Sequence, residues 1–126
     1  MSKIDVSICI VAYKAYSDLS KCLRSISALK TKRSYEVIVV DNNEEAIKMA
    51  PLLRKYPFVR YIKSPSNKGY GAGNNLAIAN AKGDYLLILN PDTELYPDTL
   101  EELCKFLKAH PKAAIVAPTL LNKSSE

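Results

Sequence analysis

The chain has 126 residues, 48% of them hydrophobic and 25% charged, which is typical of a single globular domain. Its net charge of +5 is spread along the sequence without a long basic run or interleaved aromatic residues, so nucleic-acid binding is not indicated. No apolar run approaches the roughly 18 residues of a membrane span, and the N-terminus lacks the pattern of a signal peptide. We therefore expect a cytoplasmic protein.

The first half of the chain alternates strand and helix patterns. An apolar, β-branched run predicts a buried strand at 6–13, and apolar residues at three- and four-residue spacing predict a helix at 17–29. A second buried strand is predicted at 35–41. The helical segment 44–56 is expected to kink or break near Pro51.

The second half repeats this alternation. The strand predicted at 84–90 has no polar alternation, so we expect both of its faces to be buried. Gly83 is expected to end the preceding helix, predicted at 71–83. The other predicted elements are a more exposed strand at 58–64, a helix at 96–111 with Pro97 near its first turn, and a short last strand at 113–121.

This order predicts an α/β fold: an open, mostly parallel, doubly wound, Rossmann-like sheet with helices on both faces, in one domain over 1–126. Ligands of such sheets bind beyond the carboxyl ends of the strands. The residues at the ends of the predicted strands include two carboxylates and several amides. In chain order they are Ala12, Tyr13 and Lys14; Asp41, Asn42 and Asn43; Ser64 to Asn67; and Asn90, Pro91 and Asp92.

The segment SNKGYGAGNN, residues 66–75, carries three glycines at alternate positions. Its G-x-G-x-G spacing is neither the dinucleotide fingerprint G-x-G-x-x-G nor a P-loop. Glycines allow close approach of the backbone to a ligand, and the helix start that follows favours negative charge.

Three segments together resemble the family 2 glycosyltransferases of the GT-A fold, and within them the bacterial rhamnosyltransferase type. They are VSICIVAYKAYSDLSKCLRSI, YEVIVVDNN and NKGYGAGNNLAIANAKGDYLLILNPDTEL, and the resemblance extends from about Val6 to Leu121. It implies a domain that binds a nucleotide diphosphate-sugar donor and transfers the sugar to a glycan or lipid-linked acceptor.

The resemblance also implies roles for single residues. It places Ala12 and Tyr13 against the nucleoside and Asp41 against the base, with Asn43 and Asn90 in the same nucleotide-sugar-binding set. Asn67, Gly69 and Asn74 match the diphosphate-sugar region. Asn90-Pro91-Asp92 matches the metal-binding D-x-D position, so Asp92 is expected to hold Mg²⁺ or Mn²⁺.

The chain departs from the family pattern at several points. Lys14 stands where family members often carry Asn, and Asn90 replaces the first carboxylate of D-x-D. Glu94 is either a second carboxylate of the site or a solvent-facing residue. Family members continue into an acceptor-side half that carries the general base. We therefore expect a truncated, donor-binding part whose base lies beyond Glu126, and we name no catalytic residue.

A second function remains open on this reasoning: a non-catalytic nucleotide-sugar-binding or scaffolding module. Peripheral association with the inner face of the membrane is compatible with the positive charge. A homo-oligomer is also compatible with the sequence, because the absent half could leave an apolar sheet edge uncovered. Nucleobase, sugar and acceptor are not identified by the sequence.

Overall fold

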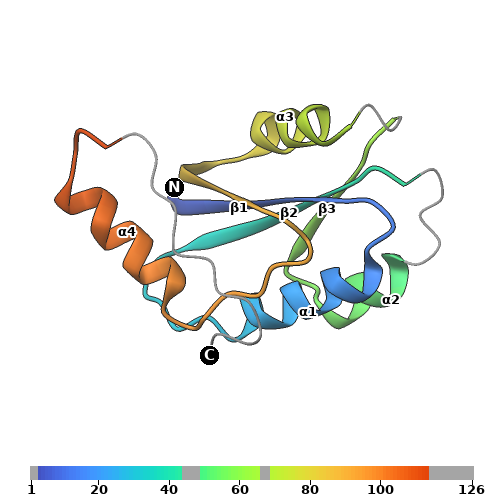
Figure 1. Cartoon of the computed structure of the whole chain (residues 1–126), viewed down its shortest axis with the longest axis horizontal. Coiled ribbons are helices and arrows are strands. Elements are labelled where there is room, and N and C mark those ends of the chain that lie inside the picture. Colours follow the sequence, from blue (N-terminus) through green and yellow to red (C-terminus); the bar gives the residue numbers. More distant parts are fainter. Residues whose placement is uncertain (1–2, 44–48, 66–68, 114–126) are drawn as a thin grey trace.

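The computed structural model describes residues 3–43, 49–65 and 69–113. In this part of the chain, four parallel strands form one sheet in the order β3-β2-β1-β4 (Figure 1). This confirms the α/β class and its parallel sheet. The elements are β1 (Ile4–Ala12), α1 (Tyr16–Ser27), β2 (Tyr35–Asp41), α2 (Met49–Lys55), β3 (Val59–Lys63), α3 (Tyr70–Asn80), β4 (Gly83–Leu89) and α4 (Thr99–Ala109).

Helices cover both faces of the sheet, with α3 on one face and α1, α2 and α4 on the other (Figure 1). Successive side chains of a strand point to opposite faces, so the two central strands must be apolar on both sides. In the larger core, the face of β1 and β2 that lies opposite α3 packs against Leu19, Leu23 and Ile26 of α1. A smaller core under α3 contains Cys9, Val11, Ile38, Val40 and Ala77.

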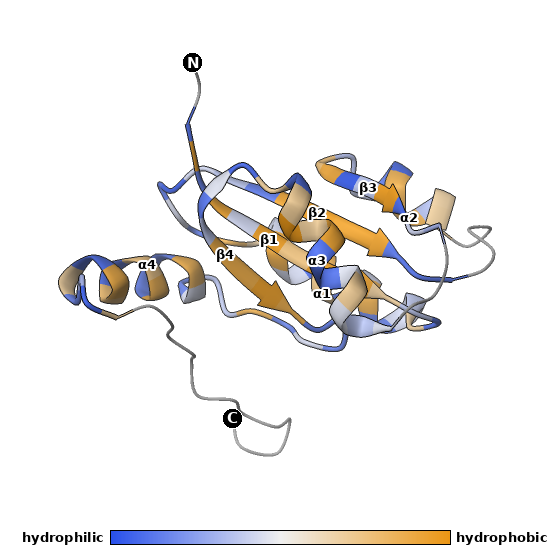
Figure 2. Cartoon of the chain, turned by 90° about the horizontal axis from the view of Figure 1, so that it is seen from above, coloured by the Kyte–Doolittle hydropathy of each residue, from blue (hydrophilic) through white to orange (hydrophobic). Residues whose placement is uncertain are grey.

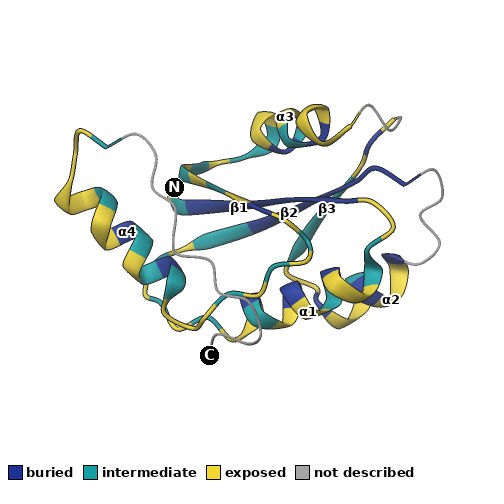
Figure 3. Ribbon diagram, viewed as in Figure 1, coloured by how far each residue is buried: buried dark blue, intermediate teal, exposed yellow. Residues whose placement is uncertain are grey.

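The prediction that the strand at 84–90 is buried on both faces is wrong. β4 is an edge strand, and burial alternates along it (Figure 3). Leu86 and Ile88 are 46% and 42% exposed on the face that α3 occupies, whereas Leu87 and Leu89 pack into the larger core. Figure 2 shows the hydrophobic ribbon of β4 beside α3 rather than beneath it.

Gly83 does not end a helix, contrary to prediction. α3 ends at Asn80, and the extended backbone of Ala81 leads directly into β4. Gly83 pairs with Ile4 at the start of the strand, where a Cβ atom would lie 2.6 Å from the backbone nitrogen of Ser7. The glycine is required by close packing of β4 on β1.

The remaining predicted elements differ from the structure in detail. Pro51 lies in the first turn of α2, where a missing N–H is tolerated, and no break is present between Met49 and Lys55. Pro97 precedes α4, which begins after the N-cap residue Asp98. The more exposed position of the third strand is confirmed, because β3 forms the other edge. Residues 44–48 and the predicted strand at 113–121, beyond Ala113, lie outside the described residues.

At the edge of the sheet where the strands begin, the carboxylate of Glu36 connects neighbouring strands. Glu36 of β2 accepts hydrogen bonds from Ser7 Oγ of β1 at 2.6 Å and from the backbone N–H of Lys82 at 2.7 Å. It also pairs with Arg60 of β3 at 2.9 Å. Although burial opposes it, these hydrogen bonds and the Arg60 charge lower the pKa of Glu36. This edge lies opposite the candidate site.

Candidate functional site

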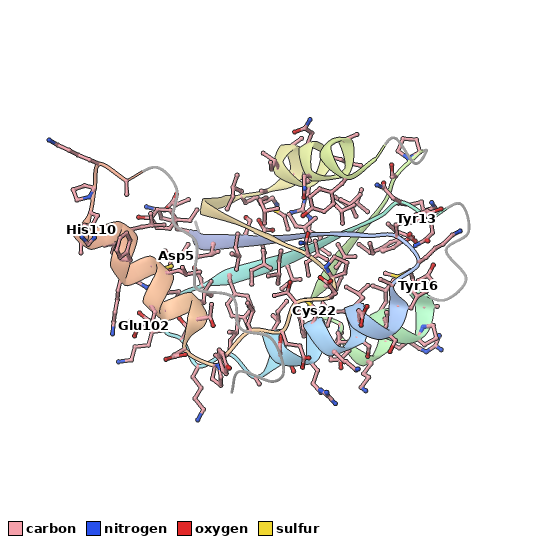
Figure 4. All side chains as sticks on the ribbon, viewed as in Figure 1. Asp5, Tyr13, Tyr16, Cys22, Glu102 and His110 are labelled. Carbon is pink, nitrogen blue, oxygen red and sulfur yellow. The ribbon has the colours of Figure 1, made fainter. Side chains whose placement is uncertain are left out.

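Polar side chains gather at the carboxyl edge of the sheet because its strands run in parallel. Ala12 at the end of β1 is the Cα partner of Asp41 at the end of β2. Leu89, the last residue of β4, comes one residue before Asn90 and pairs near the end of β1. Tyr13 lies at this end of the molecule, away from Asp5 and His110 (Figure 4). The structure thus places the residues after β1, β2 and β4 at one edge.

Asp41 is fully buried, with a relative exposure of 0%. Its Oδ2 accepts a hydrogen bond from the hydroxyl of Tyr61 at 2.7 Å, and its Oδ1 accepts from the backbone N–H and Nδ2 of Asn43 at 2.9 and 2.7 Å. Burial, together with the hydrogen bond to Asp41 and its charge, raises the pKa of Tyr61. The carboxylate therefore holds the ends of β2 and β3 together, a role that the sequence did not indicate for Tyr61.

Asn43 also contacts the loop after β1. Its Oδ1 accepts a hydrogen bond from the backbone N–H of Lys14 at 2.8 Å. Its backbone carbonyl accepts one from the ammonium group of Lys63 at the end of β3. Asp41, Asn43 and Lys14 consequently form a chain of contacts that fixes the loop after β1 against the end of β2.

The glycine-rich segment reaches the same edge through α3. Gly69 precedes the helix with φ = 95°, a left-handed conformation that suits glycine. Its carbonyl accepts a hydrogen bond from Asn42 Nδ2 at 3.1 Å. The predicted ligand residue Asn67 lies outside the described residues. Asn74 lies in the first turns of α3 and is partly buried.

Gly73 and Gly71 differ in what surrounds them. A Cβ atom at Gly73 would lie 2.7 Å from Val11 Cγ1 and 3.1 Å from Asn42 Nδ2, whereas at Gly71 it would meet nothing within 4 Å. Gly73 thus serves close packing of α3 on β1 rather than approach to a ligand. Val11 and Asn42 are thus the neighbours that determine this packing.

The segment Asn90-Pro91-Asp92 crosses the edge from one face of the sheet to the other. On the α3 side, Asn90 Oδ1 accepts a hydrogen bond from the hydroxyl of Tyr70 at 2.6 Å. On the α1 side, the following chain is held by the backbone N–H of Leu95, which donates to Ser25 Oγ at 2.9 Å. Asp92 and Glu94 are both exposed.

The acidic groups of this segment lie near α1. Burial, and then the charges of Asp92 and Glu94, raise the pKa of the Cys22 thiol to about 12. Cys22 lies below the end of β4 (Figure 4). The thiol is therefore protonated at neutral pH, and Cys9, Cys22 and Cys104 are all buried and free.

The oxygen donors of this segment suit a hard cation, but they do not form a complete cage. Asp92 and Glu94 supply exposed carboxylates, and Asn90 supplies an amide oxygen that already bonds Tyr70. Among the described residues, no group of three or more His, Cys, Asp or Glu side chains is arranged to hold a metal ion. Mg²⁺ commonly uses one or two carboxylates together with substrate phosphates, so the set fits a cation that arrives with a phosphate ligand.

Comparison with known protein families decides the affiliation of the chain. The model of glycosyl transferase family 2 matches residues 7–125. The chain belongs to this family. A low-salt glycan biosynthesis hexosyltransferase of Haloferax volcanii is 31% identical, over 94% of this chain and 38% of the relative. An N-acetylglucosaminyl-diphospho-decaprenol L-rhamnosyltransferase of Mycobacterium tuberculosis is 26% identical, over 87% of this chain and 39% of the relative.

Solved structures share the fold. Residues 1–349 of Staphylococcus aureus TarS, in complex with UDP-GlcNAc, match with a TM-score of 0.74 and 21% identity, over 86% of this chain and 32% of TarS 1–349. A Pyrobaculum calidifontis mannosyltransferase in complex with GDP-Man and Mn²⁺ matches with a TM-score of 0.75 and 20% identity, over 85% and 33%. The chain thus spans about a third of these structures and about two fifths of the curated relatives above. None of the described helices is long and apolar enough to cross a membrane.

Proposed function

We propose that this chain is the donor-binding part of an inverting glycosyltransferase. A sugar passes from a nucleotide diphosphate-sugar to a hydroxyl group of a glycan or lipid-linked acceptor, in glycan or polysaccharide synthesis. The observation that carries the proposal is the placement of Ala12, Asp41 and the Asn90-Pro91-Asp92 segment at one edge of a parallel sheet. Membership of family 2 and the likeness to structures holding UDP-GlcNAc or GDP-Man support it.

The roles of single residues are part of this proposal. Ala12 and Tyr13 lie against the nucleoside, and Asp41 and Asn43 shape the base pocket from the end of β2. Asn67, Gly69 and Asn74 line the diphosphate-sugar region with Asn90. Tyr13 is 46% exposed, which leaves its ring available for stacking on a base.

Asp92 is the residue that we assign to a divalent cation. A bound Mg²⁺ or Mn²⁺ supplies a Lewis acid that stabilises the negative charge of a diphosphate leaving group. The carboxylate of Asp92 is exposed and lies in a short segment held at both ends by Tyr70 and Ser25. That anchoring keeps the carboxylate in place before the ligand arrives, which lowers the entropic penalty of binding. We assign no residue of this chain as general base.

Calorimetric titration with a panel of nucleoside diphosphates and nucleotide sugars, with and without Mn²⁺, tests the proposal. We expect one nucleotide to bind, and Mn²⁺ to strengthen binding of its diphosphate form. Donor hydrolysis and transfer assays on the same samples separate an enzyme from a non-catalytic binding module, which binds without turnover. Failure of every nucleotide to bind would refute both functions.

A further inference from the structure

Lys14 has an unusual backbone conformation. With φ = 57°, it is the only non-glycine residue with positive φ among residues 3–43, 49–65 and 69–113. In this left-handed region the Cβ atom of an ordinary side chain crowds the following carbonyl oxygen, while Gly and Asn are tolerated well. A lysine at this position is therefore strained, and the surrounding contacts must maintain it.

The contacts that maintain it are anchored in buried structure. The backbone N–H of Lys14 donates to Asn43 Oδ1, and Asn43 in turn donates twice to the fully buried carboxylate of Asp41. The ammonium group of Lys63 holds the Asn43 carbonyl from the neighbouring strand. Strain that is fixed by so many contacts is a feature of functional sites, because it orients a side chain that a relaxed backbone would point elsewhere.

The side chain at this position carries a positive charge. The ammonium group of Lys14 lies 5.1 Å from the centroid of the exposed Tyr13 ring, and the residue is exposed. No carboxylate in the described part of the chain forms an ion pair with it. Among the described carboxylates of this edge, Asp41 is engaged by Tyr61 and Asn43.

We propose that Lys14 binds a phosphate group of the nucleoside diphosphate. This inference rests on the proposed function for the identity of the ligand. A lysine carries a compact point charge on a four-carbon stem, which suits a phosphate beside the strand end. Asparagine would relieve the backbone strain but cannot supply the charge. Charge is thus the property that distinguishes Lys14 from the residue that the turn itself favours.

The test compares Lys14→Asn, Lys14→Arg and, as a matched loss of charge outside the site, Lys21→Asn on the exposed face of α1. Calorimetry measures binding of the best nucleoside diphosphate of the panel, its parent nucleoside and inorganic pyrophosphate. We expect Lys14→Asn to weaken the diphosphate and pyrophosphate by about tenfold or more and to leave the nucleoside within about twofold. Lys14→Arg and Lys21→Asn should retain affinity for all three.

Thermal unfolding of the same variants separates binding from stability. Lys14→Asn should unfold at the same or a higher temperature than wild type, because it accommodates positive φ. Unchanged diphosphate affinity in Lys14→Asn, or an equal loss for the nucleoside, would overturn the inference. If no nucleotide binds but pyrophosphate binds through Lys14, the anion site stands while the proposed function fails. If pyrophosphate also fails to bind, both fall.

Discussion

The Asp41 carboxylate is held by Tyr61 of β3 and by Asn43 of the following loop, so one buried side chain joins two strand ends. An ionised carboxylate has about four lone-pair positions, and three donors already occupy Asp41. One position is left for a donor on a nucleobase. Because the side chain has no exposed surface, that contact requires the covering groups to move apart.

Asp41→Ala is expected to weaken nucleotide binding by about 1.5–3 kcal/mol, the range for a hydrogen bond to a charged group. The loss should be the same with and without Mn²⁺, because the residue is assigned to the base. Titration calorimetry at a temperature where both proteins are folded measures it. Tyr61→Phe, which removes one donor and keeps the carboxylate, should change affinity less. Equal affinity of wild type and Asp41→Ala would contradict the assignment.

Asp92→Ala should abolish the metal-dependent part of donor binding and leave metal-free nucleotide affinity nearly unchanged. One exposed carboxylate beside Asn90 binds a cation poorly without the oxygens of the diphosphate. Parallel titrations with Mn²⁺ and with a chelator give the two affinities. Asp84→Ala is the matched control, because Asp84 is an exposed aspartate at the start of β4, at the opposite end of the strand from this segment. Metal enhancement that survives in Asp92→Ala would count against the metal role.

At the scale of elements, α3 is fixed by how closely it approaches the sheet. Gly73 faces Val11 of β1 and Asn42, and Asn42 also binds the carbonyl before the helix. These contacts therefore determine the distance between the first turn of α3 and β1. This distance determines where Gly69 and Asn74 lie relative to the strand ends.

Gly73→Ala should destabilise the fold by about 1–3 kcal/mol, because the new methyl group overlaps the β-branched side chain of Val11. Gly71→Ala, in the same helix but facing open space, should be neutral or should stabilise by about 0.5–1 kcal/mol. Urea unfolding of the two variants measures the difference. Similar stabilities of the two variants would show that α3 does not pack against β1 in this way.

Glu36 joins the strands at the opposite edge, and its lowered pKa makes that contribution depend on pH. A carboxyl group with a lowered pKa in the folded state stabilises the fold above its unfolded pKa, and this stability is lost as pH falls through the folded value. Glu36→Gln should therefore destabilise by about 1.5–3 kcal/mol at pH 7, and the difference should shrink as pH falls below the unfolded pKa of about 4.3. Urea unfolding across this range is the measurement, with Glu102→Gln on exposed α4 as control. A difference that does not change with pH would contradict the assigned hydrogen bonds.

At the scale of the whole molecule, the two faces of the sheet are covered unequally. α1, α2 and α4 cover the face of the larger core, whereas among the described helices α3 alone covers the other (Figure 1). Leu86 and Ile88 of β4 remain 46% and 42% exposed on that side. Exposed apolar residues that lie close together are typical of surfaces that another segment or molecule covers.

Ile88→Ala and Ile8→Ala test this asymmetry with the same chemical change in neighbouring strands. Ile8 is fully buried, so its truncation should cost about 2–5 kcal/mol. Ile88 is 42% exposed, and its truncation should cost about 1 kcal/mol or less. Chemical denaturation of both variants gives the values. A large loss of stability in Ile88→Ala would show that β4 is covered in solution on the α3 side of the sheet.

The sequence by itself determined the order of the elements, the parallel sheet and the residues at its carboxyl edge. Apolar runs and helical spacing are local signals, and parallel strands place their carboxyl ends together whatever their order. Asp41, Asn43 and Asp92 were therefore located at one edge without coordinates. The family motifs supplied their expected roles, which the binding experiments must test.

Only the tertiary structure decided which side chains face each other. The sequence does not give the strand order, so it could not show that β4 is an edge strand with Leu86 and Ile88 exposed. Gly83 and Gly73 depend on distances to Ser7 and Val11, which lie more than sixty residues away in the chain. The positive φ of Lys14 depends in the same way on a contact from Asn43, in the loop after β2. Each of these features follows from packing between distant segments, and local sequence patterns carry no information about such distances.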